Sequence, residues 1–215
     1  MVWTPTEIQR LRGVDWSDAT PIMSACLPVL RSLAQDKPTL QRLVAGSCNG
    51  ALADLCEHYD ILDKLVLHSD VAGFRIRLHV FSDGYFDRPH THRWPYTTLI
   101  LSGGYEHNLF AVSEDIGERR LPMLRPIMSR LEQVGASYTL MPGTAHSVKA
   151  VPGTVSLIVR GPAVTDSFLV TDRVTGESWW QYGAKNELPE AKKLKQMTPS
   201  RRQSVIDQLL HLGVI

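Results

Sequence analysis

The sequence predicts a mainly β protein, a sandwich or barrel of short strands with helices at both ends. Between residues 74 and 170, apolar and polar residues alternate in several short runs, as they do along a strand that buries one face. Turns that contain glycine or proline separate these runs at close spacing. The predicted strands cover residues 74–81, 96–102, 105–112, 136–141, 146–151, 154–160 and 167–170.

Both ends of the chain carry helical patterns instead. From residue 21 to about residue 59, apolar residues recur three and four positions apart, which predicts two or three short helices. Towards the other end, Thr198 is a predicted N-cap, Pro199 a first helical residue and Gly213 a stop. These three residues bracket one short C-terminal helix.

One segment inside the strand region lacks a strand pattern. Residues 113–135 are charged and contain two prolines, which predicts a long loop. The chain length suits one main domain with arms. We therefore expect an N-terminal helical arm over residues 1–70, a β-barrel over 71–172 and a C-terminal extension with a helix over 173–215.

Composition and charge exclude two classes of partner. The 215 residues are 43% hydrophobic and 21% charged, with a net charge of +1, so no strong field recruits nucleic acid or an anionic membrane. No segment approaches the roughly 20 apolar residues of a membrane span, and the N-terminal residues have no signal-peptide pattern.

The three cysteines, Cys26, Cys48 and Cys56, show no paired spacing, so we expect them reduced and mostly buried. The expected location is the cytoplasm.

Three histidines form the candidate metal site. His90 and His92 are two residues apart, and on a strand this spacing projects both imidazoles to one side, about 6 to 7 Å apart along the chain. His146 follows the Pro142-Gly143 turn at the start of another predicted strand. A barrel can bring that position opposite the first pair, so the three side chains are candidate ligands of one ion.

The spacing around the first pair resembles that of the cupin superfamily, small β-barrels in which two motifs supply the ligands of one metal. The first cupin motif is Gly, five residues, His-x-His, three or four residues, Glu, six residues, Gly. Here Gly84, His90, His92, Tyr96 and Gly103 reproduce each spacing, with Tyr96 in place of the glutamate.

The second cupin motif is matched in part. It runs Gly, five residues, Pro-x-Gly-x-x-His, three residues, Asn. This chain has Gly135, then Pro142 directly before Gly143, then His146, with Ala150 where Asn is common. The resemblance covers roughly residues 74–170 and implies a cupin-like β-barrel, a double-stranded β-helix or jelly roll. Cupins commonly dimerise, so it also implies a homodimer.

The missing glutamate affects the charge of the metal site and therefore the metal expected there. Three neutral imidazoles leave a divalent ion its full charge, whereas a carboxylate ligand reduces it. The three-histidine set resembles that of the thiol dioxygenases, cupins that bind ferrous iron, which makes Fe(II) the first expectation and Zn, Ni or Mn the alternatives. The cysteine that some thiol dioxygenases cross-link to tyrosine has no counterpart near the motifs.

Other side chains near the motifs are candidates for catalysis. Tyr96, in the glutamate's place, either hydrogen-bonds a metal-bound ligand or packs there. Glu106 and Asp87 are candidates to restore the carboxylate. His107 would act as a general base near neutral pH if it enters the cavity, and otherwise it lies hydrogen-bonded in the core.

Cations and aromatic residues that face the same cavity are candidates for substrate binding. Arg75, Arg77 and His79 share one face of the predicted strand before the histidine pair, and a guanidinium group suits a carboxylate. Trp94 follows the pair directly. The alternative is that the arginines form a solvated outer face of the barrel.

The leading hypothesis is a mononuclear non-haem iron(II) oxygenase that binds a small, carboxylate-bearing metabolite together with O2. The first alternative is a non-redox isomerase, cyclase or lyase that uses the same ion as a Lewis acid. The second is a binding module without catalysis. No helix-turn-helix pattern with a basic face is present, so the sequence does not favour a DNA-binding regulator.

Overall fold

The structure is a computed structural model that describes residues 5–82, 86–111, 125–183 and 187–215. Most of its regular structure is antiparallel sheet. The largest sheet has the order β1-β2-β3-β9-β4-β7, and each neighbouring pair is antiparallel. Its strands are β1 (Glu57–His58), β2 (Leu62–Ser69), β3 (Arg75–Phe81), β9 (Val155–Arg160), β4 (Tyr96–Ser102) and β7 (Ser137–Leu140).

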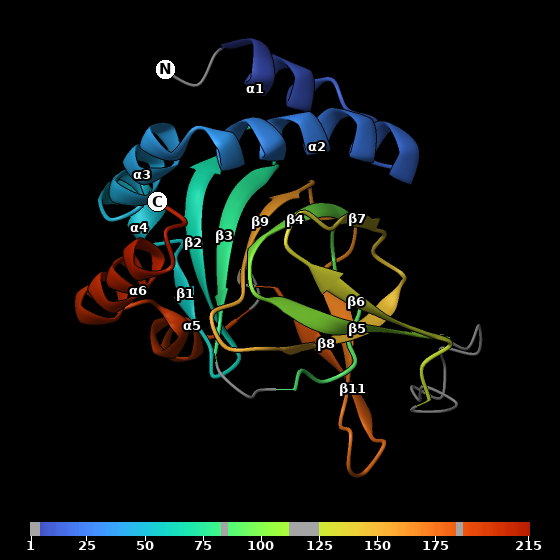
Figure 1. The fold of residues 1–215 in the computed structure, drawn as a ribbon. Helices are drawn as coiled ribbons and strands as arrows, with labels where there is room; N and C mark the ends of the chain where they lie inside the picture. Colours follow the sequence, from blue (N-terminus) through green and yellow to red (C-terminus); the bar gives the residue numbers. More distant parts are fainter. Residues whose placement is uncertain (1–4, 83–85, 112–124, 184–186) are drawn as a thin grey trace.

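A second group of strands completes the barrel. A three-stranded sheet has the order β6-β5-β8, and β10 pairs with β11 in a hairpin. These strands are β5 (Gly104–Phe110), β6 (Met128–Gln133), β8 (Ala145–Ala150), β10 (Ser167–Thr171) and β11 (Ser178–Tyr182). Figure 1 shows β5, β6 and β8 to one side of the large sheet, with the β10–β11 hairpin extending beyond them. The mainly β fold with helices at both ends is therefore confirmed.

Helices cover one face of the large sheet. They are α1 (Pro5–Arg12), α2 (Ala19–Gln35), α3 (Lys37–Gly46) and α4 (Gly50–Ala53). The Asp18 side chain accepts a hydrogen bond from the Thr20 amide and caps α2. Helix α2 packs against β4, β7 and β9, while α3 and α4 pack against β2 (Figure 1).

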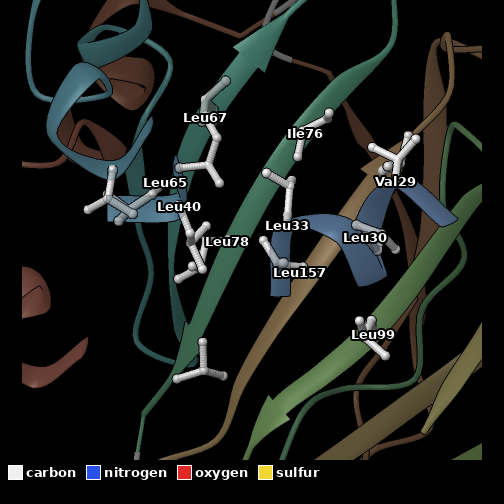
Figure 2. Close-up of a cluster of buried hydrophobic side chains, with 14 of the residues drawn as sticks. Val29, Leu30, Leu33, Leu40, Leu65, Leu67, Ile76, Leu78, Leu99 and Leu157 are labelled. Carbon is white, nitrogen blue, oxygen red and sulfur yellow. The ribbon is translucent and has the colours of Figure 1, made fainter. Parts of the chain in front are cut away.

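The main core lies between these helices and the sheet. Leu30 and Leu33 of α2 belong to one buried cluster with Leu78 and Leu157 of the strands (Figure 2). Leu78 and Leu157 are fully buried. Burying a leucine side chain contributes about 1.5–3 kcal/mol, so this face accounts for much of the stability of the fold.

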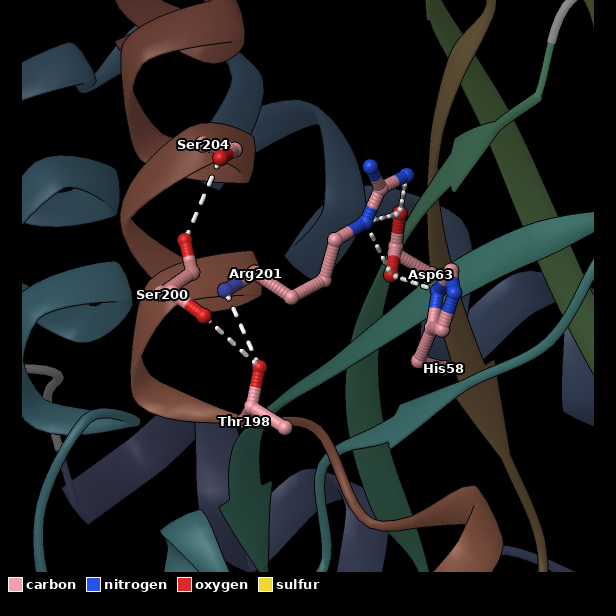
Figure 3. A network of polar contacts seen from close by, with 6 residues as sticks. All are labelled: His58, Asp63, Thr198, Ser200, Arg201 and Ser204. Carbon is pink, nitrogen blue, oxygen red and sulfur yellow. Dashed lines mark hydrogen bonds and ion pairs between the residues drawn. The ribbon is translucent and has the colours of Figure 1, made fainter.

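The C-terminal helix docks on β2 through an ion pair with a buried aspartate (Figure 3). Helix α6 (Pro199–His211) begins after the Thr198 cap, as predicted. Arg201 donates from Nε to Oδ1 of Asp63 at 3.2 Å and from Nη2 to Oδ2 at 2.6 Å, and Asp63 Oδ1 also contacts His58 Nδ1 at 2.8 Å. Hydrogen bonding to Asp63 raises the pKa of Arg201. Since the Asp63 side chain is almost fully buried, the bidentate pair holds α6 in one orientation.

Two sequence predictions about these elements are wrong. An N-terminal helical arm was predicted for residues 1–70, but the last helix of this region ends at Ala53. The residues after it form β1 and β2, which belong to the large sheet. Strand β2 has no alternating pattern, since Leu65, Val66 and Leu67 are consecutive and all buried.

Strand β6 lies within the segment predicted as a loop. Five of its six residues are exposed, so burial leaves no periodic signal there. Residues 112–124 of that segment are outside the described residues.

Three further elements were not predicted. They are α1, β11 and the short helix α5 (Pro189–Lys195). Among the described helices, none combines the length and the apolar character that a membrane span requires.

Candidate metal centre

The three candidate ligands converge from two parts of the chain. His90 and His146 form a bridge in which each amide donates to the other's carbonyl, at 2.8 and 2.9 Å. The prediction that His90 and His92 lie on a strand is wrong, because this segment is extended but makes only isolated bridges. Extended backbone still turns both imidazoles to one side, with ring centroids 4.7 Å apart.

The ring nitrogens of His90, His92 and His146 fit a single ion. One nitrogen from each lies within 4.8 Å of the others, and the Nε2 atoms of His92 and His146 are 2.8 Å apart. An ion about 2.1 Å from two nitrogens at a right angle holds them about 3 Å apart. Burial lowers the pKa of His92 and of His146 well below the usual value, which favours the neutral imidazole that binds metal.

A buried hydrogen-bond chain orients His146. Its Nδ1 lies 3.0 Å from Nε2 of His107, and Nδ1 of His107 lies 3.3 Å from Glu132 Oε1. Arg130 forms an ion pair with the same Glu132 oxygen. When Nε2 of His146 faces an ion, its Nδ1–H donates to His107, and the Nδ1–H of His107 donates to Glu132. Such outer partners fix the tautomer and ring orientation of a ligand histidine.

His90 is oriented from its other side. Its Nδ1 donates to the Arg88 carbonyl at 2.8 Å and lies 3.2 Å from Asp87 Oδ2, which leaves Nε2 free for an ion. Burial raises the pKa of Asp87. The structure therefore places Asp87 behind a ligand histidine, away from the place that the motif's glutamate would take.

Tyr96 occupies that place. Its hydroxyl lies 3.5 Å from His146 Nε2, and its ring centroid is 4.9 Å from that of His92. Burial raises the pKa of Tyr96 well above the usual value, so the phenol stays protonated near neutral pH. Beside it, the hydroxyls of Tyr105 and Tyr138 are 2.7 Å apart and form a hydroxyl-bearing wall.

The three histidines face a cavity of about 280 Å³. Its volume suits a small metabolite. One part of the lining is apolar and aromatic, and includes Phe81, Tyr96, Val148 and Ile158. Another part is cationic, with Lys64 from β2, Arg77 from β3, Arg93 and Arg160, and His79 of β3 lies beside them.

The predicted substrate-binding residues separate into two sets. Arg77, His79 and Trp94 line the cavity, so Arg77 and His79 are not on a solvated outer face. Burial lowers the pKa of His79 well below the usual value. Arg75 lies on the same face of β3 but does not line the cavity, and its Nε donates to Ser69 Oγ at 3.3 Å.

The predicted catalytic residues separate in the same way. Tyr96 lines the cavity, while His107 is fully buried behind His146. Burial lowers the pKa of His107. Glu106 is exposed and accepts a hydrogen bond from Asn108 Nδ2. Because neighbouring residues of a strand face opposite sides, Glu106 lies on the side of β5 away from His107 and the cavity, which corrects its prediction as a catalytic residue.

Sequence reasoning assigned no role to several residues of the site. Lys64 lies on the strand that was not predicted, and Arg160 ends an otherwise apolar strand. Glu132 lies on β6, in the segment predicted as a loop. Arg93 carried one available signal, since it directly follows the histidine pair.

Comparisons with known proteins bear on the fold. No protein-family model matches the chain, and no curated protein matches it in sequence. Solved structures match about half of it. An RmlC-like cupin from Shewanella frigidimarina is 17% identical, with a TM-score of 0.39, over 52% of this chain and 86% of that one. An uncharacterized protein with a double-stranded β-helix domain from Klebsiella pneumoniae is 13% identical, with a TM-score of 0.40, over 54% and 89%.

A hydroquinone 1,2-dioxygenase, PnpCD, solved with Cd2+ and 4-hydroxybenzonitrile, is 18% identical. Its TM-score is 0.36, and the match covers 46% of this chain and 63% of that one. At these scores the likenesses carry no conclusion about the activity of this chain.

Proposed function

We propose that the protein is a mononuclear metal-dependent oxygenase in which His90, His92 and His146 hold Fe(II). The observation that carries the proposal is the meeting of three imidazole nitrogens within 4.8 Å at the wall of one cavity. The substrate is a small, carboxylate-bearing metabolite bound beside the ion with O2. The homodimer and the cytoplasmic location stay predictions.

The chain's own residues have distinct tasks in this reaction. Bound Fe(II) supplies the redox chemistry with O2. Glu132 and His107 hold the tautomer of His146, while Asp87 and the Arg88 carbonyl hold that of His90. The buried apolar wall excludes water from the reacting atoms.

Tyr96 is the residue best placed to act on the substrate. Its protonated hydroxyl lies beside the ligand nitrogens, where it would donate a hydrogen bond to an oxygen of the substrate. A phenol in this position stabilises negative charge that develops on that oxygen.

The donor set also favours a second candidate function. Three neutral imidazoles leave a divalent ion its full positive charge, which suits a Lewis acid that polarises a substrate carbonyl. In a lyase or isomerase of this kind Tyr96 would move a proton, and no O2 would be used.

Oxygen uptake distinguishes the two candidates. The protein, stripped of metal and reloaded with Fe(II) or with Zn(II), is given a panel of small carboxylates in an oxygen electrode. The proposal expects O2 and a carboxylate to disappear together only with Fe(II). His146→Ala should lose the reaction, while His211→Ala, an exposed histidine on α6, should keep it. Turnover without O2 uptake would replace the oxygenase with the Lewis-acid function.

A further inference from the structure

Three arginines surround Trp94 at one end of the cavity. The guanidinium carbons of Arg77, Arg93 and Arg160 lie 5.5, 4.9 and 5.1 Å from the centre of the Trp94 ring. They come from β3, from the segment after the histidine pair and from β9, so the fold brings them together from three places. We call these three residues the arginine cluster.

The register of the sheet brings still more positive charge to this end. Arg75 of β3 lies directly opposite Arg160 of β9, and like charges in that position destabilise a sheet. Two rows further along the same face, His79 lies between Lys64 and Ser156. Burial and the positive charges of its arginine neighbours lower the pKa of Arg160 to about 8. Such an arrangement costs stability in the empty protein.

The cluster has polar atoms without partners. The Nε atoms of Arg77, Arg93 and Arg160 are buried and have no hydrogen-bond partner within the described ranges. Two other cavity residues also have a buried polar atom without a hydrogen-bond partner among the described residues. These atoms are Oγ of Ser156 and Nε2 of His79. Buried donors are rarely left unpaired unless a ligand or water completes them.

The protein's own carboxylates compensate these charges only in part. Glu57 lies 3.8 Å from Lys64, and Glu187 pairs with Lys195. Of the described residues, none forms an ion pair with a guanidinium of the cluster. Arg160 donates from Nη1 to the carbonyls of Gly73 and Gly161, which are neutral.

We propose that the arginine cluster, with Ser156 and His79, binds an oxyanion group of the substrate, a carboxylate or a phosphate. The substrate therefore has two polar ends, one at the metal and an anionic one at the cluster. That the other end of the substrate lies at the metal rests on the proposed function, whereas the anion site does not. Trp94 lies between the ends, with its ring 6.1 Å from that of His92. Guanidinium groups suit both anions because they donate two parallel hydrogen bonds.

The direct test is anion binding to metal-free protein. Inorganic phosphate, acetate and glutarate are titrated by calorimetry at constant ionic strength, with chloride as the reference. We expect saturable binding of at least one oxyanion. Tighter phosphate binding identifies a phosphate ester, and tighter glutarate or acetate binding a carboxylate. Because the protein carries no metal in this titration, the result tests the anion site even if the three histidines hold no ion.

Variants assign the binding to the cluster. Arg77→Met keeps an unbranched apolar stem without the guanidinium and should weaken binding at least 10-fold. Arg93 is partly exposed, and Arg93→Gln should do the same if Arg77→Met does not fold. Arg31→Gln, on the exposed face of α2, is the matched control and should bind like the parent. The proposal is overturned if no oxyanion binds saturably, or if the cluster variants bind as tightly as Arg31→Gln.

Discussion

The two faces of the large sheet use alternate residues of the same strands for opposite purposes. On β3, Ile76 and Leu78 face the helices and are fully buried in an apolar core. Arg77 and His79 face the cavity, and each has a buried polar atom without a partner in the described structure. One face therefore supplies stability, while the other gives up stability to form a site that a ligand completes.

The difference teaches how a small barrel carries a charged site. The cavity face alone is a poor support for the fold, because buried charges without partners are costly. The helices on the opposite face supply the compensating apolar burial. Changes on the two faces should therefore separate stability from ligand binding.

The largest effect is expected on the helix-facing side. Leu78→Ala leaves a cavity among residues that are fully buried and should lower the free energy of unfolding by about 2–5 kcal/mol. Urea unfolding followed by circular dichroism measures the change. A loss below 1 kcal/mol would contradict the assignment of the main core to this face.

Removing the outer partner of a metal ligand should be next in size. Glu132→Ala frees His107 and, through it, His146, and should weaken metal binding about 10- to 100-fold. Competition with a coloured chelator measures the affinity. Glu106→Ala, on the exposed side of β5, is the matched control and should change nothing. Equal affinities for the two variants would show that the hydrogen-bond chain does not reach the metal.

On the cavity face, Arg77→Met should not lower the free energy of unfolding as Leu78→Ala does. Because Arg77 is almost fully buried among other cations, the free energy of unfolding of the ligand-free protein should stay within about 1 kcal/mol of the parent or rise. The same urea measurement tests it beside Leu78→Ala. A loss as large as that of Leu78→Ala would mean that both faces stabilise the fold alike.

The smallest effect concerns the attachment of α1 to the turn between β2 and β3. Hydrogen bonds from Arg12 lower the pKa of Asp70 to about 2, from an ordinary value of 3.8. A carboxyl group with a lowered pKa stabilises the fold above the ordinary value, and the contribution is lost as the pH falls from about 4 towards 2. Asp70→Asn should melt at a slightly lower temperature than the parent at pH 7, and the difference should vanish near pH 2. A difference that persists at pH 2 would assign the effect to packing.

The metal ligands were predictable because short spacing identifies them. His90 and His92 are two residues apart, and the turn before His146 marks a strand start. The hydrogen-bond chain through Glu132 was not predictable, because it forms only when β6 pairs with β5 and β5 with β8. The arginine cluster depends likewise on β9 lying beside β3, a pairing between segments far apart in the chain.

Strands were predictable where apolar and polar residues alternate, as along β3. Strand β2 was missed because side chains on both of its faces are buried, and β6 because nearly all of its side chains are exposed. Both strands lack the alternation that burial of a single face imposes. The arginines were found where they share a strand with the alternating pattern, as Arg77 does, and missed at the end of an apolar run, as with Arg160.

The central claim, one metal ion held by three histidines, is tested most directly by metal analysis. Protein purified without chelators or a histidine tag is measured by inductively coupled plasma mass spectrometry, beside His92→Ala and the control His211→Ala. We expect about one equivalent of iron in the parent and in His211→Ala, and little in His92→Ala. Zinc, nickel or manganese at the same stoichiometry would keep the site and favour the Lewis-acid function. Equal metal in all three proteins, or none in the parent even after reloading with Fe(II), would contradict the claim.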